Sequence, residues 1–359
     1  MLFCLIKIYA IYICLSELFP LFIPFSQILY IIPNMEKMKP LFKTYAKYLK
    51  FFAAAVFIIV FSLSAFLYFN FYLTQGTGPA GSQIPAENFK HIWSEQKILL
   101  LGIGDSITDG FGAPAGYSYF DRLIANPPDD SCDIKGKNLS VVFPNLTANN
   151  IAVSHTVSRQ HLKVIQNFPV QPDDVMGIIV MTTGGNDLIH SYGRSAPKEC
   201  AMYGASLEIA KPWIDNFKIR LDEMITGITE KFPGGCRIFL ANIYDPSDGT
   251  GNTNELFTGL PHWPDGLLIL AEYNKIISDC ADSFDNVHLI DIYTPFLGHG
   301  IQCKKFWLKN YHFDDPHYWY YMNIEDPNPR GYDAIRRLFL LEMIKTFTTN
   351  NHNSSEPRA

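Results

Sequence analysis

Short apolar runs alternate along this chain with longer segments whose apolar residues recur at helical spacing. The runs are 98–103, 150–153, 175–181, 237–241 and 287–292, and the helical segments are 206–232, 266–284 and 332–347. Strands that alternate with helices favour a mostly parallel sheet with helices on both faces. We therefore predict an α/β fold, a three-layer αβα sandwich with five strands.

The first apolar run ends in a turn that places a hydroxyl at the carboxyl end of a strand. The run 98–103 is followed by Gly104, Asp105 and Ser106. In open α/β sheets this edge forms the ligand crevice. Ser106 there is a candidate nucleophile, because the first N–H groups of the next helix remain free to hold an oxyanion. A simple helix cap is the alternative interpretation.

Charge is distributed unevenly along the chain. Its formal net charge is −6, and from residue 79 onward 33 acidic residues outnumber 23 basic ones. An acidic body argues against nucleic acid as a partner, since binding phosphates requires a basic surface.

Residues 51–73 carry no charge and follow a basic segment at 35–50. About 20 apolar residues cross a membrane as a helix, and the lysines predict a cytoplasmic N-terminus with the catalytic domain periplasmic or extracellular. Secretion after cleavage of a signal peptide is the alternative. The apolar leader 1–34 is either an additional membrane segment or the product of a misassigned start, with translation beginning at Met35 or Met38.

The remaining boundaries follow from composition. We expect a flexible linker at 74–95, a catalytic domain at 96–348 and a disordered tail at 349–359. Five cysteines follow the anchor, and an exported domain has enough of them to form two disulfides. No cysteine or histidine pair has the spacing of metal ligands, so we expect no metal.

Four separated sequence pieces lie at the ends of expected strands or in later loops. They are GDS at 104–106, NIAVSH at 150–155, GGND at 184–187 and DDPH at 314–317, the last followed by PNPRGY at 327–332. Together they resemble the SGNH hydrolases, also called the GDSL esterase/lipase family, over roughly 96–348. This resemblance implies a flavodoxin-like sheet and a serine esterase without a cofactor.

The resemblance also implies roles for individual residues. Ser106 is the expected nucleophile, His317 its general base and Asp314 the carboxylate that orients the imidazole. Asp315 is an alternative partner for His317, and His312 is a fallback base. An Asp314–His317 salt bridge without a catalytic role is also open.

The same resemblance implies an oxyanion hole. Asn186 corresponds to the side-chain donor, and the backbone N–H groups of Ser106 and His155 are further donors. For Asn186 alone, a local turn at a strand end is the alternative.

The chain departs from the family pattern at two points. The family usually has glycine where this chain has His155, which resists unusual φ/ψ values. Either the backbone there is ordinary, or His155 narrows the pocket or contacts substrate. The family's histidine is commonly followed at once by Pro-Asn, whereas residues 318–326, rich in aromatics, separate His317 from Pro327. We predict that this insertion forms a lid or a wall, or simply packs a loop onto the core.

These observations predict a membrane-anchored serine hydrolase that cleaves a carboxylic ester through an acyl-enzyme on Ser106. Acetylated sugars or polysaccharides, lipids and small esters are candidate substrates. An acyltransferase acting on a cell-surface glycan and a catalytically weak binding module are the alternatives.

Overall fold

The structure, a computed structural model, describes residues 35–68, 73–253 and 259–348, with side chains from residue 45 in the first range and residue 74 in the second. The leader 1–34 and the tail 349–359 lie outside the described residues. The chain divides into two compact units, Met1–Phe71 and Tyr72–Ala359.

The first unit contains one long helix, α3 (Met35–Leu67). Its segment Tyr45–Leu67 is long and apolar enough to cross a membrane, and none of it is buried inside the protein. The helix continues through the expected basic segment without a break. The expected anchor, 51–73, overlaps this segment, and its residues 69–72 lie outside the described part of the chain.

The second unit has a five-stranded parallel sheet with the order β2-β1-β3-β4-β5. Its strands are β1 (Lys97–Ile103), β2 (Leu146–Asn150), β3 (Val175–Met181), β4 (Cys236–Ala241) and β5 (Val287–Ile290). Its longer helices are α6 (Tyr119–Ile124), α8 (Ser158–Asn167), α10 (Leu207–Glu230), α11 (Gly266–Ser283) and α13 (Pro329–Thr348). The shorter elements are α4 (Leu73–Gln75), η3 (Glu87–Phe89), α5 (Ser106–Asp109), α7 (Leu139–Val142), α9 (Gly185–Ile189), η4 (His190–Gly193) and α12 (Tyr293–Phe296).

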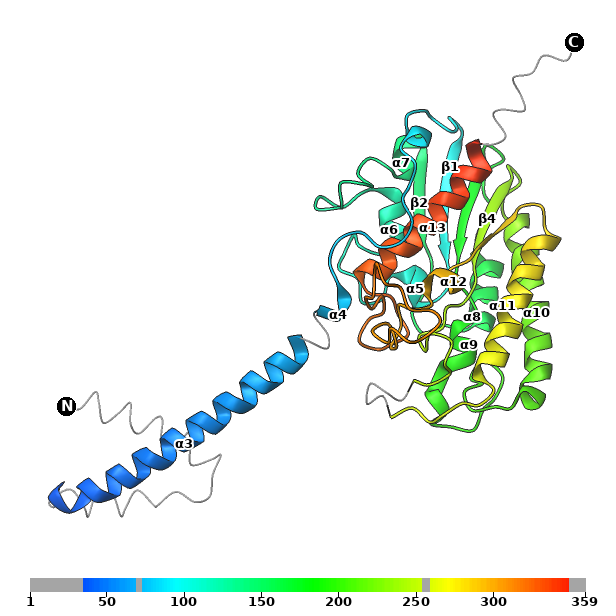
Figure 1. Ribbon diagram of the computed structural model, residues 1–359. Coiled ribbons are helices and arrows are strands. Elements are labelled where there is room, and N and C mark those ends of the chain that lie inside the picture. Colours follow the sequence, from blue (N-terminus) through cyan, green and yellow to red (C-terminus); the bar gives the residue numbers. More distant parts are fainter. Residues whose placement is uncertain (1–34, 69–72, 254–258, 349–359) are drawn as a thin grey trace, which may run out of the picture. The chain divides into compact units, whose positions relative to one another are not determined.

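Helices cover both faces of the sheet, with α6 and α13 on one side and α8, α10 and α11 on the other (Figure 1). Strand β1 shows why, since successive side chains point to opposite faces. Ile98 and Leu100 belong to the core under α13, whereas Leu101 and Ile103 belong to the core under α10. The predicted three-layer α/β sandwich is confirmed.

One predicted strand is displaced. Strand β2 ends at Asn150, the first residue of the expected strand 150–153. The rest of that apolar run lies in the loop that follows β2. Four of its five residues are exposed, because it is an edge strand, so apolar periodicity does not mark it. The register still brings the ends of β1, β2 and β3 to one edge of the sheet, with Gly102 opposite Asn150 and Ile103 opposite Met181.

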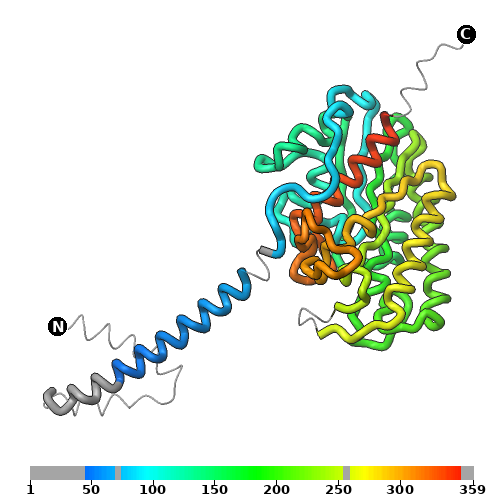
Figure 2. The backbone as a smooth tube through the Cα atoms, in the orientation of Figure 1, coloured from blue at the N-terminus to red at the C-terminus, as the bar shows by residue number. Residues whose placement is uncertain are grey.

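The segment 74–95 does not have the character expected of a flexible linker. Its Ala80, Ile84 and Phe89 are buried in the core on the α13 side. The backbone N–H of Ala80 also donates to Asp333 of α13 over 3.2 Å. Figure 2 shows this segment running over the domain beside the C-terminal helix. A few apolar side chains therefore fix a stretch whose Gly, Pro and Ser content suggests mobility.

A buried ion-pair cluster joins α13 to the loop after α6. The side chain of Arg336 bonds Asp130 over 2.6 Å and also bonds Asp333. Its neighbour Arg337 bonds Asp133 over 2.6 Å and Asp333 over 3.0 Å. Both arginines are fully buried. Five charged groups thus stabilise one another, four of them buried and Asp133 partly exposed.

All five cysteines of the second unit carry free thiols. The two disulfides that these cysteines could form are therefore not found there. Four of these thiols are buried, and Cys132 is exposed.

Candidate active site

Ser106 begins helix α5 immediately beyond β1. Gly104 makes the turn at φ 145°, and a Cβ atom there would lie 2.3 Å from the carbonyl oxygen of Thr182, so the chain requires glycine. Asp105 caps the helix by accepting the N–H of Ile107 over 3.2 Å. Ser106 is 9% exposed at the carboxyl edge of the sheet. Capping belongs to Asp105, which leaves the Ser106 hydroxyl available for chemistry.

A buried hydrogen-bond network fixes this turn to the end of β3. The hydroxyl of Thr182 donates to Asp105 over 2.8 Å and pairs with that of Thr108 over 2.8 Å. The Thr108 hydroxyl also pairs with that of Tyr119 over 2.7 Å. Burial raises the pKa of Asp105 to about 6, although the bonds from Thr182 and Ile107 oppose this effect.

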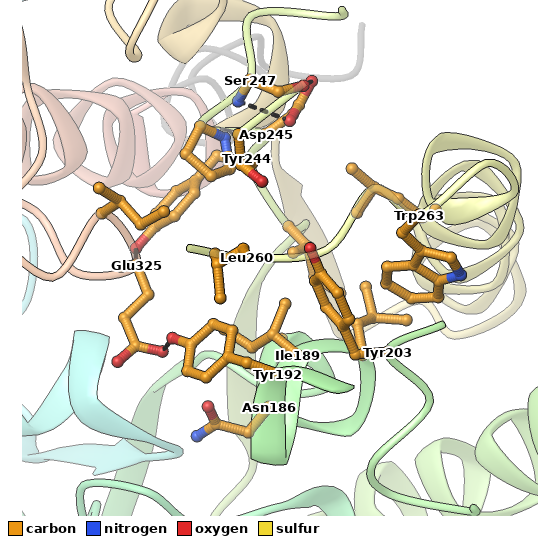
Figure 3. A pocket seen from close by; sticks show the side chains of 18 of the residues that line it. Asn186, Ile189, Tyr192, Tyr203, Tyr244, Asp245, Ser247, Leu260, Trp263 and Glu325 are labelled. Atoms are coloured by element: carbon orange, nitrogen blue, oxygen red, sulfur yellow. Dashed lines mark hydrogen bonds between the residues drawn. The ribbon is translucent and has the colours of Figure 1, made fainter. Parts of the chain in front are cut away.

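Asn186, on helix α9, lines the same cavity as Ser106 (Figure 3). Its amide nitrogen donates to the carbonyl oxygen of Thr156 over 2.9 Å. A carboxamide has two N–H donors, so this bond positions the group and leaves a second donor. This is the arrangement that an oxyanion hole needs.

Two buried side chains that the sequence analysis missed hold these loops together. Asp187, fully buried, accepts the backbone N–H of Ser158 over 2.8 Å. His161 bridges Thr183 over 2.8 Å and Thr156 over 2.9 Å, and burial lowers its pKa to about 4, so the imidazole is neutral at pH 7. The spacing 158, 161, 165 in α8 is the signal that would have identified His161 as inward-facing.

His155 lies in the loop after β2 with a left-handed backbone, φ 66°. The unusual backbone that the family's glycine permits is therefore kept here, in spite of the histidine side chain. The side chain is exposed, and its ring contacts Phe111 with centroids 5.8 Å apart. His155 is not among the residues that line the cavity.

The prediction that Asp314 orients His317 is wrong. Its Nδ1 lies 2.6 Å from Asp315, not Asp314, which is exposed. Asp315 is also held by both terminal nitrogens of Arg330 over 2.9 Å. Burial raises the pKa of Asp315, but the bonds from Arg330 and His317 outweigh it and lower the pKa overall. The bonds from Arg330 and His317 explain why Asp315 is drawn in while Asp314 faces solvent.

His317 also stands apart from Ser106. Within the described part of the chain no hydrogen bond joins the two residues, and His317 does not line the cavity. Residues 74–76 cover it instead: the N–H of Tyr318 donates to the carbonyl of Thr74 over 2.7 Å, and a Cβ atom on Gly76 would lie 2.6 Å from the ring. The fallback base, His312, bonds the carbonyl of Leu297 over 2.8 Å.

Asp326 is a buried carboxylate beside the cavity that Ser106 lines, since its neighbours Ile324 and Glu325 form part of the wall. Burial raises its pKa, and the Ser106 hydroxyl and the Asn323 amide oppose this effect. Asn323 Nδ2 lies 2.6 Å from Oδ2 of Asp326. The sequence analysis missed Asp326, although its place directly before Pro327 was a usable signal.

The cavity beside Ser106 has walls that are mainly apolar and a few polar groups (Figure 3). It encloses about 980 Å³ of empty space, its open mouth included. Its apolar walls come from α9, the loops after it, and α11: Leu188, Ile189, Tyr192, Tyr203, Leu260, Trp263, Leu267 and Leu270. On the opposite side Glu325 bonds the hydroxyl of Tyr192.

The aromatic insertion is divided between the core and the cavity wall. Trp319 and Tyr320 are buried, and Tyr320 packs edge-on against Tyr244 and Phe296. Ile324 and Glu325 reach the cavity and form part of its wall. The expected packing and the expected wall are thus both present in this one segment.

A three-layer α/β fold of this kind, with a serine and an amide at one cavity, is that of the GDSL hydrolases, a class of ester-bond hydrolases. The model of the GDSL-like lipase/acylhydrolase family matches residues 103–334. The chain belongs to this family and is an ester-bond hydrolase. No curated protein sequence gives a significant match.

Several solved structures are similar to this chain. An acetylxylan esterase from Geobacillus stearothermophilus is 17% identical, with a TM-score of 0.45, over 70% of this chain and 96% of that one. An extracellular lipase from Streptomyces rimosus is 16% identical, with a TM-score of 0.45, over 69% and 99%. A lipolytic protein of the G-D-S-L family from Veillonella parvula is 16% identical, with a TM-score of 0.41, over 70% and 98%.

Proposed function

We propose that this protein hydrolyses carboxylic esters through an acyl-enzyme on Ser106. The observation that carries the proposal is that Ser106, at the start of α5, lines one cavity together with Asn186. Attack by the Ser106 oxygen on the ester carbonyl creates an oxyanion. The free N–H of the Asn186 amide and the backbone N–H groups of Ser106 and His155 are the proposed donors to it.

The cavity walls favour an ester with an apolar acyl chain over an acetate. Side chains such as Leu188, Leu267 and Trp263 offer no partner for sugar hydroxyls along most of the wall. Each methylene buried there stabilises the bound state by about 0.8 kcal/mol. We therefore place lipid-like or other aliphatic esters ahead of acetylated polysaccharides among the candidate substrates.

A panel of p-nitrophenyl esters tests this proposal. We expect kcat/KM to rise about ten-fold from acetate to butyrate, because two more methylenes leave water. A fluorophosphonate is expected to add one adduct, located at Ser106 by mass spectrometry. A flat or falling series would contradict the apolar acyl site, and an adduct at another residue would contradict the nucleophile.

We also infer that α3 anchors the protein in a membrane with its N-terminus in the cytoplasm. The unburied apolar segment Tyr45–Leu67 and the lysines near its start support this orientation. The protein is then expected to stay in the membrane fraction after alkaline carbonate extraction. Its second unit should be digested by protease added outside intact cells. Release of a shortened, soluble chain would instead indicate signal cleavage.

A further inference from the structure

We propose that Asp326, rather than His317, is the residue that accepts the proton of the Ser106 hydroxyl. This inference rests on the proposed acyl-enzyme function, and it assigns a carboxylate to the position where the family resemblance leads one to expect an imidazole.

The position of Asp326 in the sequence supports this assignment. Pro327 and Asn328 follow it directly, as Pro-Asn commonly follows the family's catalytic histidine. Asn323 lies three residues before it, the same separation as that between Asp314 and His317. Its amide holds Oδ2 of Asp326 over 2.6 Å, so Asn323 orients the carboxylate as an aspartate would orient a histidine.

The surroundings of the carboxylate support it further. Asp326 is 1% exposed, and its buried Oδ1 has no hydrogen-bond partner among the described residues. The Ser106 hydroxyl lowers the pKa of this same carboxyl group. A buried oxygen without a partner is costly, and Oδ1 therefore retains the capacity to accept a proton. Hydrogen bonds of catalytic groups are often loose until substrate binds.

His317 has a different task. Asp315, which Arg330 also holds, bonds its ring, and the segment around Gly76 packs against it. Arg330 in turn bonds the carbonyl oxygens of Gln75 and Pro79 over 3.3 and 3.0 Å. His317 thus belongs to the contact that holds the first residues of the second unit onto the domain.

The charges around Asp326 make it a stronger base than an exposed aspartate. Burial raises its pKa, as do Asp109 and other acidic neighbours, while His155 lowers it. Glu325, raised to a pKa of about 7 by burial, Asp326 and Asp105, adds to this acidic surrounding. The carboxylate of Asp326 also helps to raise the pKa of Tyr244 and of Tyr332. A base is more effective when its pKa approaches the working pH.

The proton can be followed through both half-reactions. Asp326 takes the Ser106 proton as Oγ bonds the ester carbonyl carbon, and it returns that proton to the alcohol oxygen as the ester bond breaks. Asp326 then takes a proton from water as the water oxygen bonds the acyl carbon. Ser106 regains the proton when its bond to the acyl group breaks, and a carboxylic acid leaves.

Three variants in the full-length protein, assayed with p-nitrophenyl butyrate, test this inference. We expect Asp326→Asn to lower kcat about 10³-fold, since it keeps the shape of the side chain but removes the base. His317→Gln should lower kcat less than ten-fold. Asp326→His should recover at least ten-fold over Asp326→Asn. Unchanged melting temperatures show that each variant is folded.

The pH profile separates a base from a structural residue. Wild-type kcat/KM should fall as the pH falls through the pKa of Asp326, because a base must be deprotonated. In Asp326→His the midpoint of that fall should move. The inference is overturned if Asp326→Asn stays active while Ser106→Ala is inactive, or if His317→Gln alone removes activity. Full activity of Ser106→Ala would instead overturn the proposed function itself.

Discussion

Replacing Ser106 with alanine is expected to lower kcat for p-nitrophenyl esters by about 10⁴- to 10⁶-fold, as removal of the nucleophile does in other serine hydrolases. Alanine keeps the helix start, because Asp105 caps α5. Only the attacking oxygen is lost, so a variant with an unchanged melting temperature should have almost no activity.

A matched control is Ser283→Ala, which removes an exposed serine hydroxyl at the end of α11. The Ser283 hydroxyl bonds the carbonyl of Asp279 over 2.6 Å, and neither residue lines the cavity. Its kcat should match that of the wild type. Ester turnover in Ser106→Ala within ten-fold of the wild type would exclude the acyl-enzyme.

The turn that carries Ser106 could be predicted from the sequence because its signals are local. An apolar run, then Gly104 and Asp105, determines where β1 ends and α5 begins. Asn186 follows from the same logic at the end of β3. Parallel strands bring these two ends to one edge of the sheet, so no knowledge of packing was needed.

The residue that faces Ser106 from the C-terminal loop could not be predicted in this way. Both Asp314–His317 and Asn323–Asp326 have the same spacing, and only packing over the 299–328 segment decides which pair approaches Ser106. Burial of Trp319 and Tyr320 fixes the loop so that Asp326 points inward. His317 instead bonds Asp315, which Arg330 also bonds. Such choices depend on contacts between distant segments, which periodicity does not encode.

The segment 74–95 also shows that contacts between distant segments cannot be predicted from the sequence. Its composition is typical of a flexible chain, yet Ala80 and Ile84 are buried. The nitrogen of Lys137 also holds the carbonyl of Ile84 over 2.5 Å. Two or three anchoring contacts can order a stretch of this length, and composition averages them away.

The largest expected loss of stability follows from breaking the ion-pair cluster on α13. Arg336→Met keeps the length of the side chain but leaves the buried carboxylates of Asp130 and Asp333 without this partner. Removing one member of a buried charge pair costs about 3–5 kcal/mol, because the charge that remains is poorly solvated. We expect the free energy of unfolding to fall by this amount, as measured in detergent by urea titration.

The pH dependence of unfolding gives this prediction a second readout. Burial raises the pKa of Asp130, but the bonds from Arg336 and Asn126 outweigh it, so the folded-state pKa is lower than the unfolded one. The wild type therefore has the full contribution above about pH 4 and loses it as the pH falls through the depressed folded pKa. Arg336→Met should lose less stability over this acid range. The exposed pair Lys97–Asp174 supplies the control, since Lys97→Met should leave the urea midpoint nearly unchanged. An Arg336→Met variant as stable as Lys97→Met would show that Asp130 and Asp333 are solvated or paired without Arg336.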